Sequence, residues 1–432
     1  MRDAVAVKSS TRLFLAGVGA VATAGNAIRP VRQRRLAVPA FALGLGPSEF
    51  PLHTALLQLT VGGLLARGGG TRGWRGKLGV AAHLAAVAGL AALHRTARTA
   101  GDVLDAALTD GLGTDYRSRI HEPFAPRPEA ALTSRRLLAP EMRVRRRYRS
   151  ARDIAYGDFG ARNQLDVWKR TDLGAAARAP VLLQIHGGAW TMGRKEGQAE
   201  PLMAHLAERG WVCVTANYRL SPRATWPDHI IDVKRALAWT KANIADHGGD
   251  PGFVVITGGS AGGHLCSLAA LTPNLADFQP GFEDDDTSVA AAVPFYGLYD
   301  FTDGRGTSSA ELEEFLAARV FKSTLADDHV RWQQASPISH VGPHAPPFFV
   351  LHGTNDSLVP LAQPRAFVDA LRNASRQPVV YAELPGAQHA FEAMPSLRTH
   401  ATVHAVERFL AVVRSASGGP TPAEAVTTPA PS

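Results

Sequence analysis

From about residue 140 onward, short continuous apolar runs alternate with longer amphipathic stretches. The runs are rich in β-branched and aromatic residues, as in strands that helices cover on both faces. The stretches between them repeat apolar residues at helical spacing, most clearly at 228–245. Because strands that alternate with helices form right-handed βαβ units, the pattern predicts an α/β fold with a doubly wound, mostly parallel sheet and helices on both faces. The expected strands are 142–149 at the edge, 163–169, 180–185, 211–216, 253–257, 289–296, 347–351 and 379–384.

The first hundred residues have a different pattern. Three apolar stretches, 13–28, 52–66 and 78–93, are each 15 or 16 residues long, rich in Ala and Gly and free of acidic residues. Each is short for a membrane span, which needs about 20 apolar residues. Clusters of Arg and Lys separate them, and short apolar helices with basic flanks suit a membrane with anionic headgroups. We therefore predict an apolar helical extension over 1–100 that associates with a membrane through residues 13–93.

Two other interpretations of this extension stay open. It could be a soluble helical extension that packs on the rest of the chain. Its first stretch could also belong to a secretory signal, because Arg2, Lys8 and Arg12 precede it and the Ala-Thr-Ala sequence at 22–24 resembles a cleavage site. A signal would explain only the first of the three stretches. The expected localisation is therefore membrane-associated, of unknown orientation, with a secreted or cytoplasmic protein as the alternative.

Charge separates the same two parts of the chain. The net charge is +8, but residues 1–152 carry 24 of the 46 Lys and Arg and only 9 of the 38 Asp and Glu. The basic run at 142–149 fits an edge strand better than a nucleic-acid surface, because no aromatic stacking platform or groove-reading helix accompanies it. The two cysteines, Cys213 and Cys266, form neither a disulfide framework nor a metal-ligand cluster. We predict no nucleic-acid partner, no metal and no cofactor.

The composition also suggests domain boundaries. A linker with several prolines is expected at 101–135, followed by the α/β domain at 136–415. Within that domain, 300–337 breaks the alternation of strands and helices and is expected to form a small cap. The last residues, 416–432, are rich in Pro, Ala, Ser and Thr and are expected to be disordered.

The strand at 253–257 leads into the strongest motif of the chain. Gly258-Gly259-Ser260-Ala261-Gly262 matches G-x-S-x-G, and a helix-compatible stretch follows it. In a strand–turn–helix setting this motif lifts a serine hydroxyl above the end of the sheet. Glycines flank the serine because the backbones approach closely and leave no room for a Cβ. We predict that Ser260 is a nucleophile at a helix N-terminus, where free N–H groups favour a developing anion.

Two polar residues that follow the last two strands could serve this nucleophile. Asp356 and His389 complete the chain order Ser, Asp, His, which among triad enzymes belongs to the α/β-hydrolase arrangement. Serine is a poor nucleophile until a base takes its proton, and His389 would do so and later protonate the leaving group. Asp356 would orient the imidazole and stabilise its charge. Asp300 and Asp303, after the preceding strand, are competing candidates for the acid.

The strand at 180–185 ends in His186-Gly187-Gly188-Ala189-Trp190. The tetrahedral intermediate of acyl transfer carries a negative oxygen that needs convergent N–H donors. A turn without bulky side chains lets the backbone reach the substrate. We predict an oxyanion hole in which Gly188, Ala189 and Ala261 donate and Gly187 shapes the turn. His186 is expected to be structural.

These motifs resemble a known family. HGGAW, GGSAGG and the later Asp and His loops, together with NYRLSP and WPDHIIDVKRALAW, look like the hormone-sensitive-lipase-type esterases of the α/β-hydrolase fold, over roughly residues 140–415. The layout with a basic apolar extension is similar to actinobacterial lipases and esterases of the LipM and LipC kind. Ala189 replaces the third glycine of the usual HGGG, as in HGG-x-W relatives that include kynurenine formamidases and prenylcysteine methylesterases. Gly259 replaces the acid often found before the nucleophile.

The resemblance implies a serine carboxylic ester hydrolase, an esterase or lipase that works through an acyl-enzyme on a small or lipid-like ester. An amidase, formamidase or peptidase on the same fold is the alternative among enzymes. A catalytically silent hydrolase fold that serves as a membrane-attached binding protein is an alternative of another class. The acyl chain, the alcohol and the oligomeric state follow from no motif in the chain.

Overall fold

A computed structural model describes residues 2–33, 35–121, 124–126, 147–304, 306 and 310–418. Within these residues eight strands form one sheet in the order β1-β2-β4-β3-β5-β6-β7-β8. The strands β1 and β2, and β2 and β4, pair antiparallel, and all later neighbours pair parallel. The strands are β1 Arg149–Ala155, β2 Gln164–Trp168, β3 Ala179–Ile185, β4 Val212–Ala216, β5 Gly249–Gly259, β6 Ala291–Phe295, β7 Phe348–Gly353 and β8 Val379–Leu384.

The predicted doubly wound, mostly parallel sheet is confirmed. Its continuous apolar strands have a simple cause. In β3 the side chains of Val181 and Leu183 pack in the core on one face of the sheet, and Leu182 packs in the core on the other. Because both faces are covered, no position along the strand faces water. The edge strand was predicted at 142–149, but β1 begins only at Arg149 and runs to Ala155. Residues 142–146 lie outside the described part of the chain.

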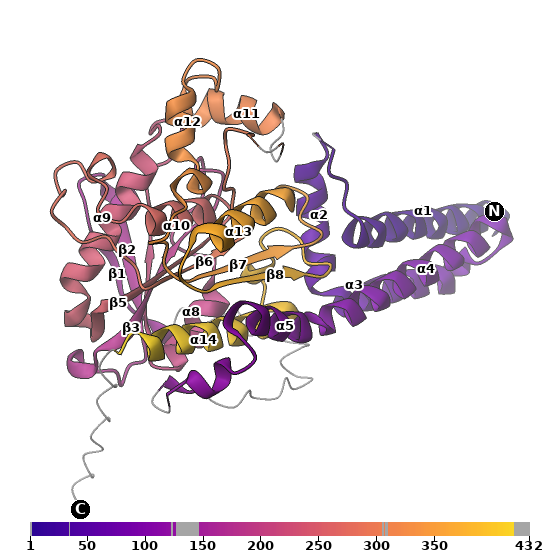
Figure 1. The fold of residues 1–432 in the computed structure, drawn as a ribbon. Coiled ribbons are helices and arrows are strands. Elements are labelled where there is room, and N and C mark those ends of the chain that lie inside the picture. Colours follow the sequence, from indigo (N-terminus) through magenta and orange to yellow (C-terminus); the bar gives the residue numbers. More distant parts are fainter. Residues whose placement is uncertain are drawn as a thin grey trace, which may run out of the picture.

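Helices cover both faces of the sheet (Figure 1). One core cluster contains side chains of α9 (Asp228–Asn243), α10 (Ala261–Leu271) and α13 (Ala362–Ala374). The other contains side chains of α5 (Ala100–Leu112), α8 (Glu200–Glu208) and α14 (Leu397–Ala416).

The helix α5 lies in the interval 101–135 that the sequence assigned to a linker. Its side chains Leu104 and Leu108 are fully buried in the core on the α14 side of the sheet. The helix therefore covers the sheet as α8 and α14 do, and residues 127–135 lie outside the described part. In the proposed cap, α11 (Ala310–Leu316) runs directly into a π-helical turn, Ala317–Phe321, and α12 (His329–Ala335) follows after a short loop. Phe321 stacks on Trp332 with ring centroids 4.4 Å apart.

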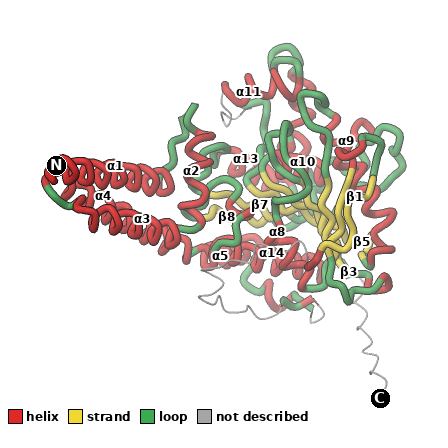
Figure 2. The backbone as a smooth tube through the Cα atoms, turned by 180° about the vertical axis from the view of Figure 1, so that it is seen from behind, coloured by secondary structure: helices red, strands yellow, loops and turns green. Residues whose placement is uncertain are grey.

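The first four helices are α1 (Arg2–Ile28), α2 (Ala37–Glu49), α3 (Pro51–Leu65) and α4 (Gly73–Arg98). Three of them, α1, α3 and α4, form an arm that projects from the β8 edge of the α/β domain (Figure 1; Figure 2). The N-terminus and the α3–α4 turn lie at its far tip. The helix α2 stands at the base of the arm, against the domain. We call these four helices together the N-terminal arm.

Small residues hold the arm helices together. A Cβ on Gly17 of α1 would lie 2.7 Å from the carbonyl oxygen of Gly79 on α4, and a Cβ on Gly62 of α3 would lie 2.8 Å from the ring of His83. The core of the arm consists of Ala20, Ala24, Ala55, Ala86 and Leu90. The helices therefore approach closely through Gly and Ala, and many of their larger apolar side chains, such as Leu15, Leu56 and Leu64, are exposed.

Candidate active site

Ser260 stands between the end of β5 and the start of α10. Its backbone has φ 58° and ψ −121°, a conformation that costs free energy for a residue with a Cβ. The surrounding fold imposes it: the Ser260 N–H donates to the carbonyl oxygen of Phe295 at 3.0 Å, and the Ser260 carbonyl accepts from His264 at 2.9 Å. The side chain is half-buried. The sequence therefore forms the sharp strand-to-helix turn that was predicted for G-x-S-x-G.

The glycines around this serine have specific neighbours. A Cβ on Gly262 would overlap the carbonyl oxygen of Ile185 at the end of β3. A Cβ on Gly259 would lie 2.5 Å from the hydroxyl oxygen of Tyr296. The Tyr296 side chain thus fills the space beside the position where relatives of the resembled family often carry an acid.

Asp356 and His389 meet in the loops that follow β7 and β8. Their side chains join through Asp356 Oδ2 and His389 Nδ1, 2.7 Å apart. Both residues are buried, with exposed fractions of 2% and 5%. Asp356 Oδ1 accepts hydrogen bonds from the backbone N–H groups of Leu358 and Val359, both at 2.8 Å. The carboxylate is therefore held by the turn on one side and bonded to the imidazole on the other.

Burial raises the pKa of the Asp356 carboxyl, but the charge of His389 and the nearby imidazole of His352 outweigh burial and hold the pKa well below its usual range. His352 Nε2 lies 3.3 Å from Asp356 Oδ2. The competing acid Asp300 has different partners: its Oδ1 accepts from the N–H and the hydroxyl of Thr302, at 2.9 and 2.7 Å.

The Ser260 turn and the His389 loop are brought together by Tyr296. This residue follows β6; its ring centroid lies 4.4 Å from that of His389, and its hydroxyl lies against Gly259. No hydrogen bond joins Ser260 Oγ to His389 within the described residues. In enzymes without substrate, such a bond is often longer than in the reacting complex.

The loop after β3 lies against the same turn. A Cβ on Gly187 would lie 3.2 Å from Ser260 Cβ, so these two residues are neighbours. The Gly187 N–H already donates to Gln198 Oε1 at 2.6 Å. Within the described residues, the N–H groups of Gly188, Ala189 and Ala261 donate to no other group. Ala261 is the first residue of α10, and the first N–H groups of a helix have no hydrogen-bond partner within the helix.

His186, at the start of this loop, is fully buried and stacks on Tyr218 with ring centroids 4.3 Å apart. Its Nδ1 lies 2.8 Å from the carbonyl oxygen of Gly187. Burial lowers the pKa of this histidine to about 4, so the imidazole is neutral at pH 7. A neutral ring in this place stabilises the loop.

Three residues near the site carry no motif and were not predicted. The hydroxyl of Tyr296 donates to the buried carboxyl group of Glu392. Burial raises the pKa of Glu392 to about 7. Phe41, from the arm, contacts the ring of His389. No local spacing in the sequence links these residues to Ser260.

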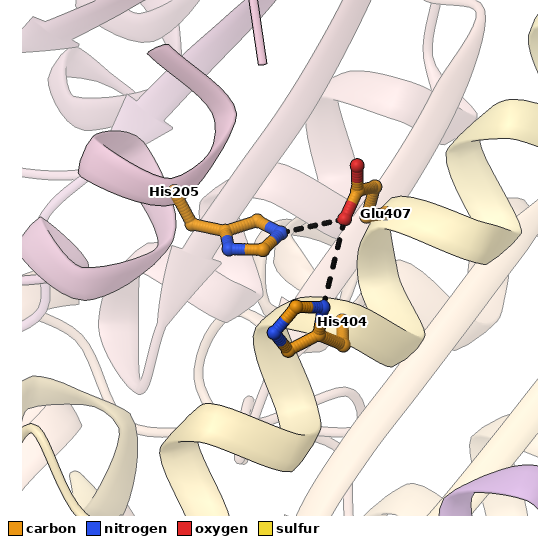
Figure 3. Close-up of side chains that lie close together, drawn as sticks. All are labelled: His205, His404 and Glu407. Atoms are coloured by element: carbon orange, nitrogen blue, oxygen red, sulfur yellow. Dashed lines mark hydrogen bonds and ion pairs between the residues drawn. The ribbon is translucent and has the colours of Figure 1, made fainter. Parts of the chain in front are cut away.

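A separate cluster, His205, His404 and Glu407, joins α8 to α14 (Figure 3). Its three potential metal-ligand atoms lie within 4.8 Å of one another. His205 Nε2 is 2.7 Å from Glu407 Oε2, and the guanidinium of Arg209 lies 2.9 Å from Glu407 Oε1. Because Arg209 already supplies a positive charge to this carboxylate, the cluster is explained as an ion-pair network between two helices.

Comparison with known proteins identifies the class of this fold. Residues 165–371 match the family model described as BD-FAE. The chain is 51% identical over 420 residues to the protein named "Probable carboxylic ester hydrolase LipM" of Mycobacterium tuberculosis, covering 96% of each chain. It is 50% identical over 319 residues to esterase LipQ of the same organism, covering 73% of this chain and 76% of LipQ. A truncated carbohydrate esterase from gut microbiota has the same fold, with a TM-score of 0.51, 22% identity and coverage of 61% of this chain and 98% of that one.

The fold is that of an α/β-hydrolase. The chain belongs to the family of LipM-type carboxylic ester hydrolases, and the resemblance drawn from HGGAW and GGSAGG is confirmed. Because the match to LipM covers 96% of the chain, it extends well into the N-terminal arm.

Proposed function

We propose that the protein hydrolyses carboxylic esters through an acyl-enzyme on Ser260, with His389 as general base and acid and Asp356 as its partner. The hydrogen bond of 2.7 Å between His389 Nδ1 and Asp356 Oδ2 carries this proposal. It fixes which imidazole nitrogen holds the proton, so that Nε2 is free to accept one from a serine hydroxyl. The low pKa of Asp356 keeps a negative charge beside the imidazolium as it forms.

In the first step Ser260 Oγ attacks the ester carbonyl carbon, and its proton passes to His389. The carbonyl oxygen becomes negative and is stabilised by the N–H groups of Gly188, Ala189 and Ala261. The bond from carbon to the alcohol oxygen then breaks, and His389 gives its proton to that oxygen. Water repeats the sequence on the acyl-enzyme, releases the acid and restores the serine. The relatives named as esterases support an ester over an amide.

A fluorophosphonate probe tests this proposal. The probe should label the full-length protein once per chain, and Ser260→Ala should abolish both labelling and the hydrolysis of p-nitrophenyl butyrate. Ser267→Ala is the matched control, because Ser267 lies on α10 and its hydroxyl bonds to the Gly263 carbonyl oxygen. Turnover that survives in purified Ser260→Ala would overturn the assignment. An unlabelled but folded parent would instead point to the silent, binding-protein alternative.

We also propose that the N-terminal arm inserts in a membrane. Two helical regions, Lys8–Ile28 and Gly73–Leu112, are long and apolar enough to cross one, and α4, the first 26 residues of the second region, belongs to the arm. Among the described residues, every exposed large hydrophobic side chain lies on residues 15–84 except Phe159, Met192 and Val330. Small residues inside and large apolar residues outside are typical of helices packed in lipid, where association depends on close backbone approach.

Basic residues flank the apolar part of the arm. The basic residues of 8–12 and 67–77 lie in the half of the arm toward the tip, and those of 29–32 and 95–98 lie toward the base. Sixteen helical residues, as in the stretch 13–28, span about 24 Å, which is most of the roughly 30 Å apolar thickness of a bilayer. This pattern supports an arm that enters the apolar layer with its charges at both headgroup levels.

Membrane sedimentation tests this second proposal. The full-length protein should sediment with membranes and stay there in high salt, which removes merely electrostatic binding. Replacing the exposed Leu56, Leu57 and Leu64 of α3 by Gln should shift it to the supernatant. Val330→Gln, an equally exposed site on α12, should leave it in the pellet. A parent protein found in the supernatant without detergent would refute membrane insertion.

A further inference from the structure

One helix of the arm touches the catalytic base of the proposed mechanism. The rings of Phe41 on α2 and His389 meet edge to face, with centroids 5.7 Å apart and planes at 86°. The ring of Tyr296 contacts the same imidazole from the α/β domain. The side chain of His389 is therefore enclosed by one aromatic residue of the domain and one of the arm.

The helix α2 is fixed to the loops that carry the acid and the base. The hydroxyl of Ser48 donates to the carbonyl oxygen of Gly386 at 2.7 Å. The hydroxyl of Ser357 donates to the carbonyl oxygen of Ala37 at 3.2 Å. These contacts lie near the two ends of α2, so Phe41 is held in place between them.

The end of α1 is joined to the same site. Asn355, next to Asp356, donates from its side-chain amide to the carbonyl oxygens of Ala27 and Ile28, both at 2.9 Å. Arg32 donates to the carbonyl oxygen of Thr354 at 2.6 Å. The arm is thus part of the site's wall, in contact with both catalytic loops.

The proposed reaction determines which part of the substrate lies beside Phe41 and the rest of the arm. The carbonyl oxygen must lie at the N–H groups of Gly188, Ala189 and Ala261. The alcohol oxygen must lie at His389, because the imidazole hands it a proton. A side chain that packs on His389, as Phe41 does, is therefore beside the alcohol and away from the carbonyl oxygen.

The helix that carries Phe41 and the helix that follows it both have exposed apolar side chains. Val38 and Leu43 on α2 are 64% and 70% exposed, and Leu56 and Leu57 on α3 are 61% and 63% exposed. Figure 1 shows α2 between the α/β domain and the rest of the arm. An alcohol group that leaves the site past Phe41 would reach the exposed apolar side chains of α2, and α3 carries further ones from the base of the arm toward its tip.

We propose that Phe41 is a specificity-determining residue that selects esters of long or bulky apolar alcohols, and that α2 guides these alcohol groups between the site and the lipid layer. This inference rests on the proposed ester hydrolysis, and it adds the alcohol as the recognised part of the substrate. Its substrate class is a lipid-like ester whose larger apolar group lies on the alcohol side.

Two series of esters test the inference on full-length protein in detergent micelles. One series keeps the acetyl group and varies the alcohol from ethanol to decanol, followed by acid release. The other keeps p-nitrophenol and varies the acid from acetate to decanoate. Phe41→Ala should lower the ratio of kcat/KM for decyl acetate over ethyl acetate about tenfold, because the contact with the alcohol is lost. The corresponding ratio for decanoate over acetate should change less than about twofold.

Phe14→Ala is the matched control, since Phe14 is an arm phenylalanine whose ring meets Trp74 at the start of α4 edge to face, with 6.2 Å between ring centroids. It should change neither ratio. Complete labelling by a fluorophosphonate shows that each variant is folded, and Phe41→Leu serves if Phe41→Ala is not. An unchanged alcohol ratio, a change in the acyl ratio instead, or an equal loss on all esters would each overturn the inference. Hydrolysis that persists in Ser260→Ala would separately refute the underlying reaction.

Discussion

Glu49 on α2 and Arg398 on α14 form an ion pair with N···O 3.1 Å, and both side chains are completely buried. Ser396 donates a further hydrogen bond to Glu49 at 2.7 Å, and Arg398 donates to the carbonyl oxygen of Ser48 at 2.8 Å. Burial raises the pKa of Glu49 and lowers the pKa of Arg398. The arm and the α/β domain are thus joined by a charged pair that neither part could bury alone.

We expect Glu49→Gln to destabilise the protein by about 3–5 kcal/mol, because it leaves Arg398 buried without its counter-charge. Replacing both residues by Leu should cost clearly less than the single change. The free energy of unfolding in detergent measures both. Arg365→Ala, which breaks the exposed pair with Glu383, is the control and should cost less than about 1 kcal/mol. A Glu49→Gln protein as stable as the parent would mean that the arm and the domain unfold separately.

The second prediction separates the two candidate acids. Asp356→Asn should lower kcat by about 10³–10⁴, because the amide favours the wrong imidazole tautomer at His389. Asp300→Asn should retain most of the activity, because Asp300 bonds to Thr302. Steady-state kinetics on a short-chain p-nitrophenyl ester compares them. The reverse order of effects would move the acid to the loop after β6.

The third prediction concerns the pH dependence of stability. The pKa of Glu392 is raised from 4.5 to about 7 by burial. Folding therefore binds its proton more tightly: the stabilisation is complete below pH 4.5 and is lost as the pH rises through 7. The loss amounts to about 3 kcal/mol. Glu392→Gln keeps an acceptor for Tyr296 and should remove this slope. Urea unfolding at pH 5 and pH 8 measures it, and an identical slope in parent and variant would contradict the prediction.

Much of the α/β domain could be predicted because its strands and site residues are marked by patterns within short segments of the sequence. Strands covered on both faces must be continuously apolar, and the polar residues that follow them gather at one edge of the sheet. The boundaries depend on tertiary pairing: β5 starts at Gly249, before the apolar run at 253–257, because Gly249 pairs with Ala179 of β3. No local pattern carries that information.

The contacts of the arm could not be predicted for the same reason. Phe41 and His389 are far apart in the sequence, and no motif around either residue indicates that the two are in contact. The helix α5 is a different case. Its buried leucines, Leu104, Leu108 and Leu112, follow one another at helical spacing, and this stripe distinguishes a packed helix from a linker.

The last prediction tests the packing of the arm with two neighbouring glycines of α1. A Cβ on Gly17 would lie 2.7 Å from the carbonyl oxygen of Gly79, whereas a Cβ on Gly19 meets nothing within 4 Å. We expect Gly17→Ala to push α1 away from α4 and to destabilise the protein by about 1–3 kcal/mol. Gly19→Ala should be neutral or stabilising by up to about 1 kcal/mol, because Ala favours a helix more than Gly does.

Thermal unfolding in detergent measures these two changes, and the same samples show whether the arm supports the site. The end of α1 is bonded to Asn355, next to Asp356, so a displaced α1 should lower kcat in Gly17→Ala and leave it unchanged in Gly19→Ala. If Gly17→Ala loses stability but keeps full activity, the arm packs as described without supporting the catalytic loops. If both variants behave like the parent, the close approach of α1 and α4 at Gly17 is wrong.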